Sequence, residues 1–276
     1  MIDRREFLQW SVGAVAASRF PYPVSRDRLD RIGIQLYSVR NAMREGFDGT
    51  LARVAELGYA EVEFAGYFGR TPEQVRQVLE RTGLSAPATH LPFDLLGGDW
   101  EAALDAAART GHRYLVVAWI PEESRRTLDD WKRVAERFNR AGEAARARNL
   151  VFGYHNHHFE LRSVEGRRPL DLLLAETEPA NVVFELDLYW CVMAGGDPLA
   201  FFAAHPGRFP LVHVKDSAGP PDHRMVNVGR GTIDFKAIFA RRRQAGIRHA
   251  FVEHDNPADP FAFARASLEY LKRLEF

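Results

Sequence analysis

Cysteine is nearly absent from this sequence of 276 residues, which contains only Cys191. A single cysteine excludes an intrachain disulfide and any metal cage built from several thiolates. An excess of either charge is absent too, since 37 Lys and Arg residues balance 37 Asp and Glu residues. No overall field therefore favours nucleic acid as a partner, and we expect a small, neutral or weakly charged substrate.

Several features that would indicate other architectures are also missing. No Pro/Gly/Ser-rich stretch offers a linker between domains, and 46% hydrophobic residues suffice for one large α/β core. Residues 34–39, at the end of the first predicted strand, contain no Gly-rich phosphate loop, which disfavours a doubly wound open sheet. A Gly-x-Ser-x-Gly elbow is absent as well, which disfavours a Ser-His-Asp hydrolase.

The amino terminus resembles a twin-arginine export signal, in which Arg4 and Arg5 are followed by Phe7 and Leu8. The apolar stretch at residues 10–17 is shorter than the roughly 20 residues that a transmembrane helix needs. We therefore predict that residues 1–30 form a signal and linker, that residues 31–276 form the folded domain, and that the protein is periplasmic without a transmembrane span. The alternative is an amphipathic helix on a cytoplasmic enzyme.

Short apolar or β-branched runs alternate with helix-period segments from residue 31 onward, which predicts βα units and a parallel sheet. The predicted strands are 31–37, 60–64, 85–90, 114–119, 150–155, 182–187, 210–214 and 249–253. The predicted helices are 50–57, 72–81, 100–109, 128–148, 169–176, 198–204, 235–244 and 260–274. Eight such pairs fit a single-domain (β/α)8 TIM barrel, whose usual size is about 250 residues; a doubly wound sheet is the alternative.

Side chains of residue types that commonly bind metal ions lie at the ends of four of the predicted strands. His155, Asp187, His213 and Glu253 are separated by 32, 26 and 40 residues, intervals that fit one strand and one returning helix each time. The carboxyl ends of barrel strands meet at one mouth, so these side chains can converge there. Imidazole and carboxylate without thiolate suit Mn, Zn, Co or Fe, with Mg less favoured.

Each of these ligands has a structural alternative. Asp187 could merely cap the following turn, and His213 could be a hydrogen-bonded strand histidine. His155 and His157 fall on the same face if the strand continues, so one could bind metal while the other contacts substrate or moves a proton. His158 is expected to point elsewhere.

A second group of candidates could contact a substrate at the same mouth. The aromatic residues could stack on a sugar ring, with core packing as their alternative. Glu63 and His90 stand near strand ends, where a structural hydrogen-bonding role is an equal alternative, and Lys215 opens the long 215–232 loop. The predicted substrate contacts are Glu63, His90, Lys215, Tyr37, Trp119 and Trp190.

From residue 31 to the end the chain resembles the sugar phosphate isomerase/epimerase family with xylose-isomerase-like barrels. The resemblance rests on Gly-Tyr-His-Asn-His-His-Phe-Glu-Leu at 153–161, Glu-Leu-Asp-Leu-Tyr-Trp at 185–190 and His-Val-Lys-Asp at 213–216, with a weaker Gly-Gly-Asp-Pro at 195–198. It implies a divalent metal held by His155, Asp187, His213 and Glu253, and it implies that Glu160 touches the sugar.

One position departs from the pattern that this resemblance implies. Better-characterised epimerases of the group carry a Glu at the end of strand five, and two Glu residues exchange a proton beside the carbonyl. Here that position is His155, so Glu253 is the only obvious carboxylate of the pair. If His155 binds metal its lone pair is taken, and His157 or a metal-bound water must act as the base.

The resemblance leaves several functions open. We expect a metal-dependent sugar isomerase or epimerase acting through an enediolate, with a lyase or hydratase on 3-keto-glycosides or related oxidised sugars as the first alternative. A non-catalytic sugar-binding protein is the second. Metal-dependent endonucleases that cut abasic DNA are also similar, but they need more ligands and a basic groove. We expect a sugar or keto-sugar partner and allow a homo-oligomer.

Overall fold

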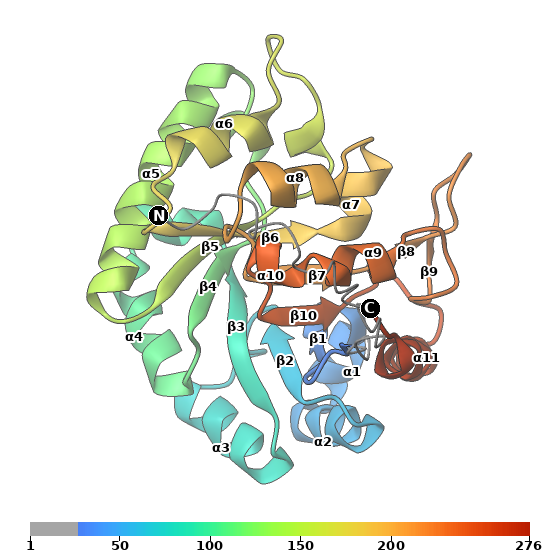
Figure 1. Ribbon diagram of the computed structural model, residues 1–276. Coiled ribbons are helices and arrows are strands. Elements are labelled where there is room, and N and C mark those ends of the chain that lie inside the picture. The colour runs from blue at the N-terminus through green and yellow to red at the C-terminus, as the bar shows by residue number, and fades with distance from the viewer. Residues whose placement is uncertain (1–26) are drawn as a thin grey trace, which may run out of the picture.

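Short parallel strands alternate with helices along the chain in the computed structural model, which describes residues 27–276 (Figure 1). The barrel strands are β1 Gly33–Gln35, β2 Glu61–Phe64, β3 Ser85–Leu91, β4 Tyr114–Val117, β5 Val151–His155, β6 Val182–Asp187, β7 Leu211–Val214 and β10 His249–Val252. The helices are α1 Arg40–Glu45, α2 Phe47–Leu57, α3 Pro72–Thr82, α4 Trp100–Thr110, α5 Leu128–Ala147, α6 Pro169–Glu176, α7 Leu188–Met193, α8 Pro198–Ala204, α9 Phe235–Ala240, α10 Arg242–Ala245 and α11 Pro260–Arg273.

The eight strands close into a barrel in the order β1, β10, β7, β6, β5, β4, β3, β2, with the helices on the outside (Figure 1). Since β1 pairs in parallel with both β2 and β10, the sheet has no open edge. This closed ring confirms the predicted single-domain (β/α)8 TIM barrel and excludes the open doubly wound sheet. In the long loop after β7, β8 Asp216–Ser217 and β9 Met225–Val226 form a separate antiparallel pair.

Several helices begin and end at the capping residues that the sequence offers. The hydroxyl of Thr71 accepts a hydrogen bond from the backbone N–H of Gln74, whose side chain accepts one from the N–H of Thr71, so a capping box starts α3. The side chains of Asp197 and Asp259 cap α8 and α11 by accepting backbone hydrogen bonds, each ahead of a proline at the first helical position. Left-handed glycines end four helices at Gly58, Gly83, Gly111 and Gly246.

Some predicted bounds are wrong. The predicted strand 31–37 is only Gly33–Gln35 long, because the side chain of Gln35 accepts a hydrogen bond from the backbone N–H of Tyr37 and starts a 3-10 turn. The predicted helix 235–244 is two helices, since the backbone departs from helical geometry at Arg241. The helices α1 and α7 were not predicted; α1 follows the 3-10 turn after β1, and α7 begins directly after β6.

An apolar layer fills the middle of the barrel. Phe251, Leu211 and Tyr114 belong to a small buried cluster with Ala88 and Val116. A Cβ atom at Gly33 would lie 2.4 Å from the ring of Phe251, so that ring fills the space a side chain on β1 would need. Alternation along β10 places His249 on one side of this layer and Glu253 on the other.

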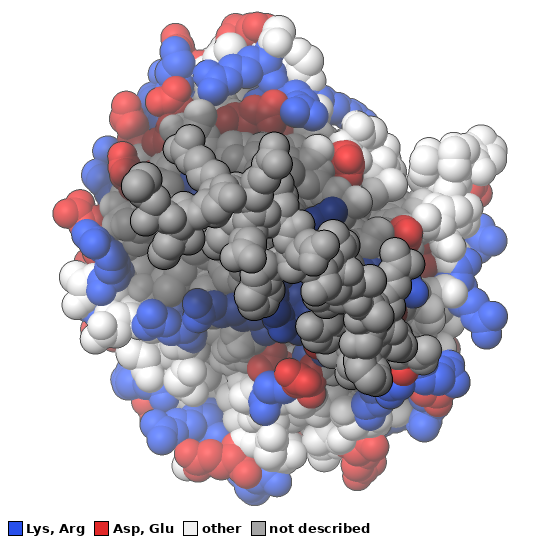
Figure 2. All heavy atoms as spheres, in the orientation of Figure 1, with Lys and Arg blue, Asp and Glu red and all other residues white. Residues whose placement is uncertain are grey.

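The surface of the described residues carries charges of both signs. Acidic and basic side chains are interspersed around the rim seen in Figure 2. Between residues 27 and 276, no helix is both long and apolar enough to cross a membrane. The predicted export motif lies in residues 1–26, outside the described residues.

Candidate metal centre

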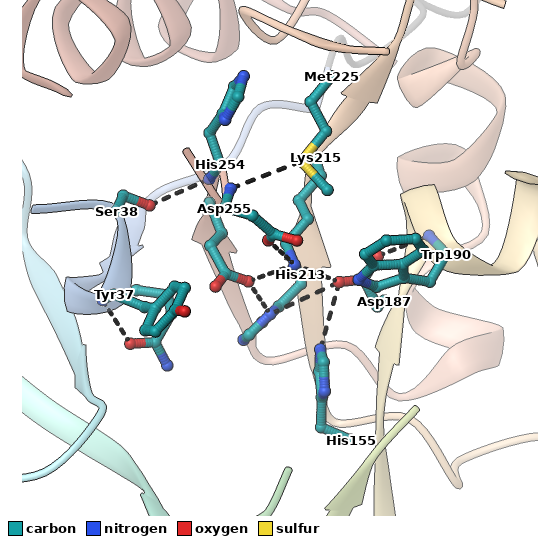
Figure 3. A network of polar contacts seen from close by, with 12 residues as sticks. Tyr37, Ser38, His155, Asp187, Trp190, His213, Lys215, Met225, His254 and Asp255 are labelled. Carbon is teal, nitrogen blue, oxygen red and sulfur yellow. Dashed lines mark hydrogen bonds and ion pairs between the residues drawn. The ribbon is translucent and has the colours of Figure 1, made fainter. Parts of the chain in front are cut away.

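Four metal-type side chains converge at the carboxyl end of the barrel. His155, Asp187, His213 and Glu253 each offer a donor atom, and these atoms all lie within 4.8 Å of one another. His155 Nε2 lies 3.2 Å from Asp187 Oδ2, and His213 Nδ1 lies 2.6 Å from Glu253 Oε2. All four side chains are buried, and His155, Asp187 and His213 point toward one another in Figure 3. We call this set the mouth site.

Two donor atoms of the mouth site indicate that it can hold a cation. His213 Nδ1 and Glu253 Oε2 are buried and 2.6 Å apart, and Glu253 Oε2 also lies 2.8 Å from Lys215 Nζ, yet none of these ion-pair contacts has hydrogen-bond geometry among the described residues. Buried polar atoms in folded proteins are normally satisfied, so such a pair needs an explanation. Two imidazoles and two carboxylates are ligands that Mn, Zn, Co and Fe accept, and these residues therefore fit a divalent metal ion.

Asp187 caps the following helix, and its second carboxylate oxygen still faces the mouth site. Its Oδ1 accepts a hydrogen bond from the backbone N–H of Trp190 at 2.8 Å and caps α7. Its Oδ2 faces the mouth site, and its backbone N–H donates to Asn156 Oδ1 at 3.1 Å. The cap therefore fixes the carboxylate without using the oxygen that faces His155.

Lys215 and Asp255 adjoin the mouth site (Figure 3). Lys215 Nζ lies 3.0 Å from Asp187 Oδ2, 2.8 Å from Glu253 Oε2 and 2.8 Å from Asp255 Oδ1. Burial alone would lower the pKa of Lys215, but the charges of these carboxylates outweigh it and raise the pKa well above its usual range. Burial raises the pKa of Asp255, although the ammonium of Lys215 opposes this.

A second polar cluster lies immediately beneath the mouth site. His213 Nε2 lies 2.7 Å from Glu63 Oε2 and 3.2 Å from Glu185 Oε2. His90 Nε2 lies 2.8 Å from Glu185 Oε2 and 3.2 Å from Glu63 Oε2. We call Glu63, His90, Glu185 and His213 Nε2 the inner cluster. The side chain of Gln35 donates to Glu63 Oε2 at 2.8 Å and closes the cluster on the β1 side.

The charges of the inner cluster shift two pKa values. Burial alone would lower the pKa of His90, but the nearby Glu63 and Glu185 raise it to about 9. Burial alone would raise the pKa of Glu185, but His213 and His90 lower it to about 2. The cluster is thus a compact arrangement of opposite charges shielded from water.

A cavity of about 340 Å³ opens above the two clusters. Its wall includes His90, His157 and Lys215, together with Tyr37 and Trp119, residues that are 42% and 50% exposed. Exposed aromatic faces beside polar groups are suited to binding a sugar ring. Burial, followed by the charges of the neighbouring His155 and Lys215, lowers the pKa of His157 to about 2.

Glu63, Glu160 and Trp190 were predicted to touch substrate, and none of them belongs to the cavity wall. Glu160 Oε2 accepts a hydrogen bond from the backbone N–H of His157 at 2.9 Å, while Oε1 accepts one from the hydroxyl of Tyr154. Burial raises the pKa of Glu160 to about 7. Glu160 therefore braces the turn that presents His157, Glu63 lies in the inner cluster, and Trp190 lies beside Asp187 and Lys215.

Sequence reasoning missed Gln35, Glu185 and Asp255. Glu185 stands two residues before Asp187 on β6, so strand alternation places both on the inner face. Asp255 follows Glu253 by two residues, beyond the end of β10, and Gln35 stands in the same position on β1 as the strand-end residues of its neighbours. The alternation of side chains could have identified Glu185, whereas Asp255 depends on the path of a loop.

Known proteins share this fold and part of this sequence. The profile of the family described as xylose isomerase-like TIM barrel matches residues 51–274. The crystal structure of a sugar phosphate isomerase/epimerase from Parabacteroides distasonis is 27% identical, covers 91% of this chain and 98% of its own, and superposes with a TM-score of 0.77. The crystal structure of IOLI protein with a bound zinc atom has a TM-score of 0.70 at 13% identity, which shows the fold alone.

Curated relatives point to one enzyme name. An inosose dehydratase from Lacticaseibacillus casei is 24% identical over 265 residues, covering 82% of this chain and 88% of that protein. An inosose dehydratase from Geobacillus thermodenitrificans is 23% identical over 266 residues, with 82% and 89% coverage. These relatives support an enzyme and leave its class open between lyase and isomerase. The family match over most of the barrel shows that the chain belongs to the xylose isomerase-like TIM barrel family.

Proposed function

We propose that this protein is a divalent-metal-dependent lyase that acts on a keto-sugar or keto-cyclitol. It removes a proton from the carbon beside the carbonyl and then expels a hydroxyl or alkoxy group from the next carbon. The observation that carries the proposal is the mouth site, with Lys215 and Asp255 beside it at the wall of a 340 Å³ cavity. That volume is at the small end of ligand sites, which span roughly 300–1,000 Å³, and suits a single sugar-sized ring.

His155, Asp187, His213 and Glu253 would hold the metal ion. A bound divalent cation polarises a carbonyl oxygen and makes the neighbouring C–H bond more acidic. With two neutral imidazoles and two carboxylates, the donor set balances a charge of +2, so Lys215 and Asp255 are left to neutralise each other. A neutral ligand enters such a site without the cost of an unpaired charge.

Asp255 and Lys215 are placed to handle the proton and the developing charge. Asp255 lines the cavity, its carboxylate is held 2.8 Å from Lys215 Nζ, and its raised pKa makes it a better proton acceptor than an ordinary aspartate. The ammonium of Lys215 stabilises negative charge as it grows on the substrate oxygen. His157, with a pKa of about 2, is a weak base, and we assign it a hydrogen bond to a substrate hydroxyl.

Elimination is favoured over isomerisation by two findings. The curated relatives that span 82% of the chain are dehydratases. In addition, His155 stands where the two-Glu exchange of epimerases would need a carboxylate, which leaves one face of the substrate without an obvious proton donor. Isomerisation or epimerisation is the second candidate, because the Parabacteroides distasonis structure covering 98% of its own length is a sugar phosphate isomerase/epimerase.

The experiment that tests this proposal is a substrate panel in D₂O. Metal-loaded protein is incubated with an inosose, a 3-keto-glucoside and a free keto-hexose, and products are followed by NMR and mass spectrometry. A lyase releases water or the aglycone, whereas an isomerase incorporates deuterium beside the carbonyl and keeps every substituent. Sugar binding without deuterium exchange or product formation in the whole panel would support a non-catalytic binder instead.

We further propose that residues 1–30 direct export by the twin-arginine route, which carries folded proteins and would allow the metal to be acquired first. The support is the Arg4-Arg5 motif in the sequence. Replacing both arginines by lysine should leave the protein in the cytoplasmic fraction, and an unchanged periplasmic fraction would contradict the proposal. Homo-oligomer formation stays a prediction, which light scattering would test.

A further inference from the structure

We propose that the inner cluster is a second cation site, which shares His213 with the mouth site. His213 presents its two nitrogens to two separate donor sets. Nδ1 lies 2.6 Å from Glu253 Oε2, and Nε2 lies 2.7 Å from Glu63 Oε2. After releasing its ring protons to solvent, His213 would bridge two divalent ions as an imidazolate, with one ion at the barrel mouth and one within the barrel.

The donor types and their spacing fit a small divalent cation. Glu63, His90, Glu185 and His213 offer two carboxylates and two imidazoles, and their donor atoms lie within 4.8 Å of one another. The nitrogen-to-oxygen distances run from 2.7 to 3.2 Å. Tetrahedral zinc at about 2.1 Å from each donor needs edges of about 3.4 Å, so the nitrogen-to-oxygen distances must increase by about 0.2–0.7 Å.

Two oxygens of the inner cluster have no partner among the described residues. Glu63 Oε1 and Glu185 Oε1 have no hydrogen-bond partner, and both residues are 0% exposed, so water does not reach them either. A carboxylate oxygen that is buried without a donor destabilises the folded protein. A cation that binds both oxygens of each carboxylate removes this destabilisation. These two atoms therefore point to a ligand independently of the cluster itself.

A cation can reach the inner cluster from the cavity. His90 lines the cavity wall and its side chain is 14% exposed, whereas Glu63, Glu185 and His213 are fully buried behind it. Rotation of the His90 ring would open the route, and its Nε2 would then close the coordination. The ligand set selects zinc, cobalt or manganese rather than calcium or magnesium, because half of its donors are imidazoles.

The experiment is zinc stoichiometry in four versions of the full chain. Apo protein is loaded with excess zinc, desalted and analysed by mass spectrometry of the metal; circular dichroism confirms that each variant is folded. The variants are Glu63→Gln for the inner cluster, Asp187→Asn for the mouth site and Glu61→Gln as the matched control. Glu61 is also a buried glutamate bonded to a histidine, but it lies at the opposite end of the barrel.

We expect about two zinc ions per chain in the wild type and in Glu61→Gln, and about one in each of the other variants. Should Glu63→Gln fail to fold, Glu185→Gln replaces it with the same expectation. The inference uses the proposed mouth site only through the shared His213, and the outcomes separate them. If the wild type binds one zinc ion, and only Asp187→Asn removes it while Glu63→Gln at most weakens its affinity, the inner site is overturned and the proposed function stands. If the wild type binds one zinc ion that only Glu63→Gln removes, the mouth site is overturned instead.

Discussion

The two ends of the barrel carry the same kinds of side chain in different states of pairing. At the amino-terminal end, Glu61 Oε1 accepts a hydrogen bond from Arg31 Nε at 2.8 Å, and its Oε2 lies 2.8 Å from His249 Nδ1. At the mouth, Glu253 Oε2 lies 2.6 Å from His213 Nδ1 and 2.8 Å from Lys215 Nζ, ion-pair contacts that lack hydrogen-bond geometry. The apolar layer around Phe251 separates the two ends.

This difference distinguishes residues that stabilise the fold from residues that are placed to bind a ligand. A buried Glu–His pair in which each oxygen has its own donor is complete, and changing it alters stability. The carboxylates and imidazoles at the mouth are crowded and incompletely paired, an arrangement that becomes favourable when a ligand supplies the missing charge. The location agrees with the general rule that TIM-barrel chemistry occupies the carboxyl ends of the strands.

The largest expected effect is that of Glu253→Gln. The substitution removes one of two carboxylates of the mouth site and a contact of Lys215, so turnover should fall on the order of 10³-fold. Steady-state kinetics with zinc content measured in parallel checks this. Unchanged turnover with the metal retained would refute the assignment of Glu253.

Asp255→Asn should have the next largest effect. The amide keeps the size of the side chain but cannot accept the substrate proton, so kcat should fall about 10²-fold while the metal content is unchanged. Asp222→Asn, at an exposed position of the loop between β8 and β9, is the control. A fall in zinc content rather than in kcat would make Asp255 a support of the metal site and not the base.

Trp119→Ala should affect binding more than chemistry. Trp119 is 50% exposed at the cavity wall, and loss of its ring removes stacking area that contributes equally before and during the reaction. KM should rise about tenfold with little change in kcat. Steady-state kinetics of the wild type and Trp119→Ala at saturating metal measure both constants. An unchanged KM would place the sugar elsewhere in the cavity.

Glu61→Gln should leave turnover unchanged and lower the free energy of unfolding by about 1–3 kcal/mol, because Arg31 and His249 lose their charged partner. Urea denaturation and steady-state kinetics measure the two quantities. A loss of activity without a loss of stability would break the distinction between the two ends of the barrel.

The stability of Glu61→Gln should depend less on pH in the acidic range than that of the wild type. Burial alone would raise the pKa of Glu61, but His249 and Arg31 lower it below its ordinary value of 4.5. A carboxyl with a depressed pKa in the folded state adds stability above pH 4.5, and this contribution disappears as the pH falls through the folded pKa. The difference in melting temperature between wild type and Glu61→Gln should therefore be full at pH 7 and shrink below pH 4.5.

Much of the fold could be predicted, because each βα unit contains its own hydrophobic periodicity and its own helix-capping residues. Thr71 and Asp259 mark helix starts by local hydrogen bonds that need no distant partner. The convergence of His155 and Asp187 also followed from spacing, since parallel strands in chain order place their carboxyl ends together.

Other parts of the site depend on contacts between distant segments. Lys215 contacts three carboxylates from β6 and from the segment after β10, which no local pattern specifies. Glu160 has the spacing of a substrate ligand, yet its two oxygens are used within the turn by Tyr154 and His157. Whether the four mouth residues bind metal stays a prediction, because their proximity alone does not test it.

Exchange of the substrate α proton with solvent tests the central claim most directly. Zinc- or manganese-loaded wild-type protein, incubated with a keto-cyclitol or 3-keto-glucoside in D₂O, should place deuterium beside the carbonyl or release the β substituent with loss of that proton. The metal-free protein and Glu253→Gln should do neither. Product formation in which the α proton is retained, or equal rates with and without metal, would contradict the account.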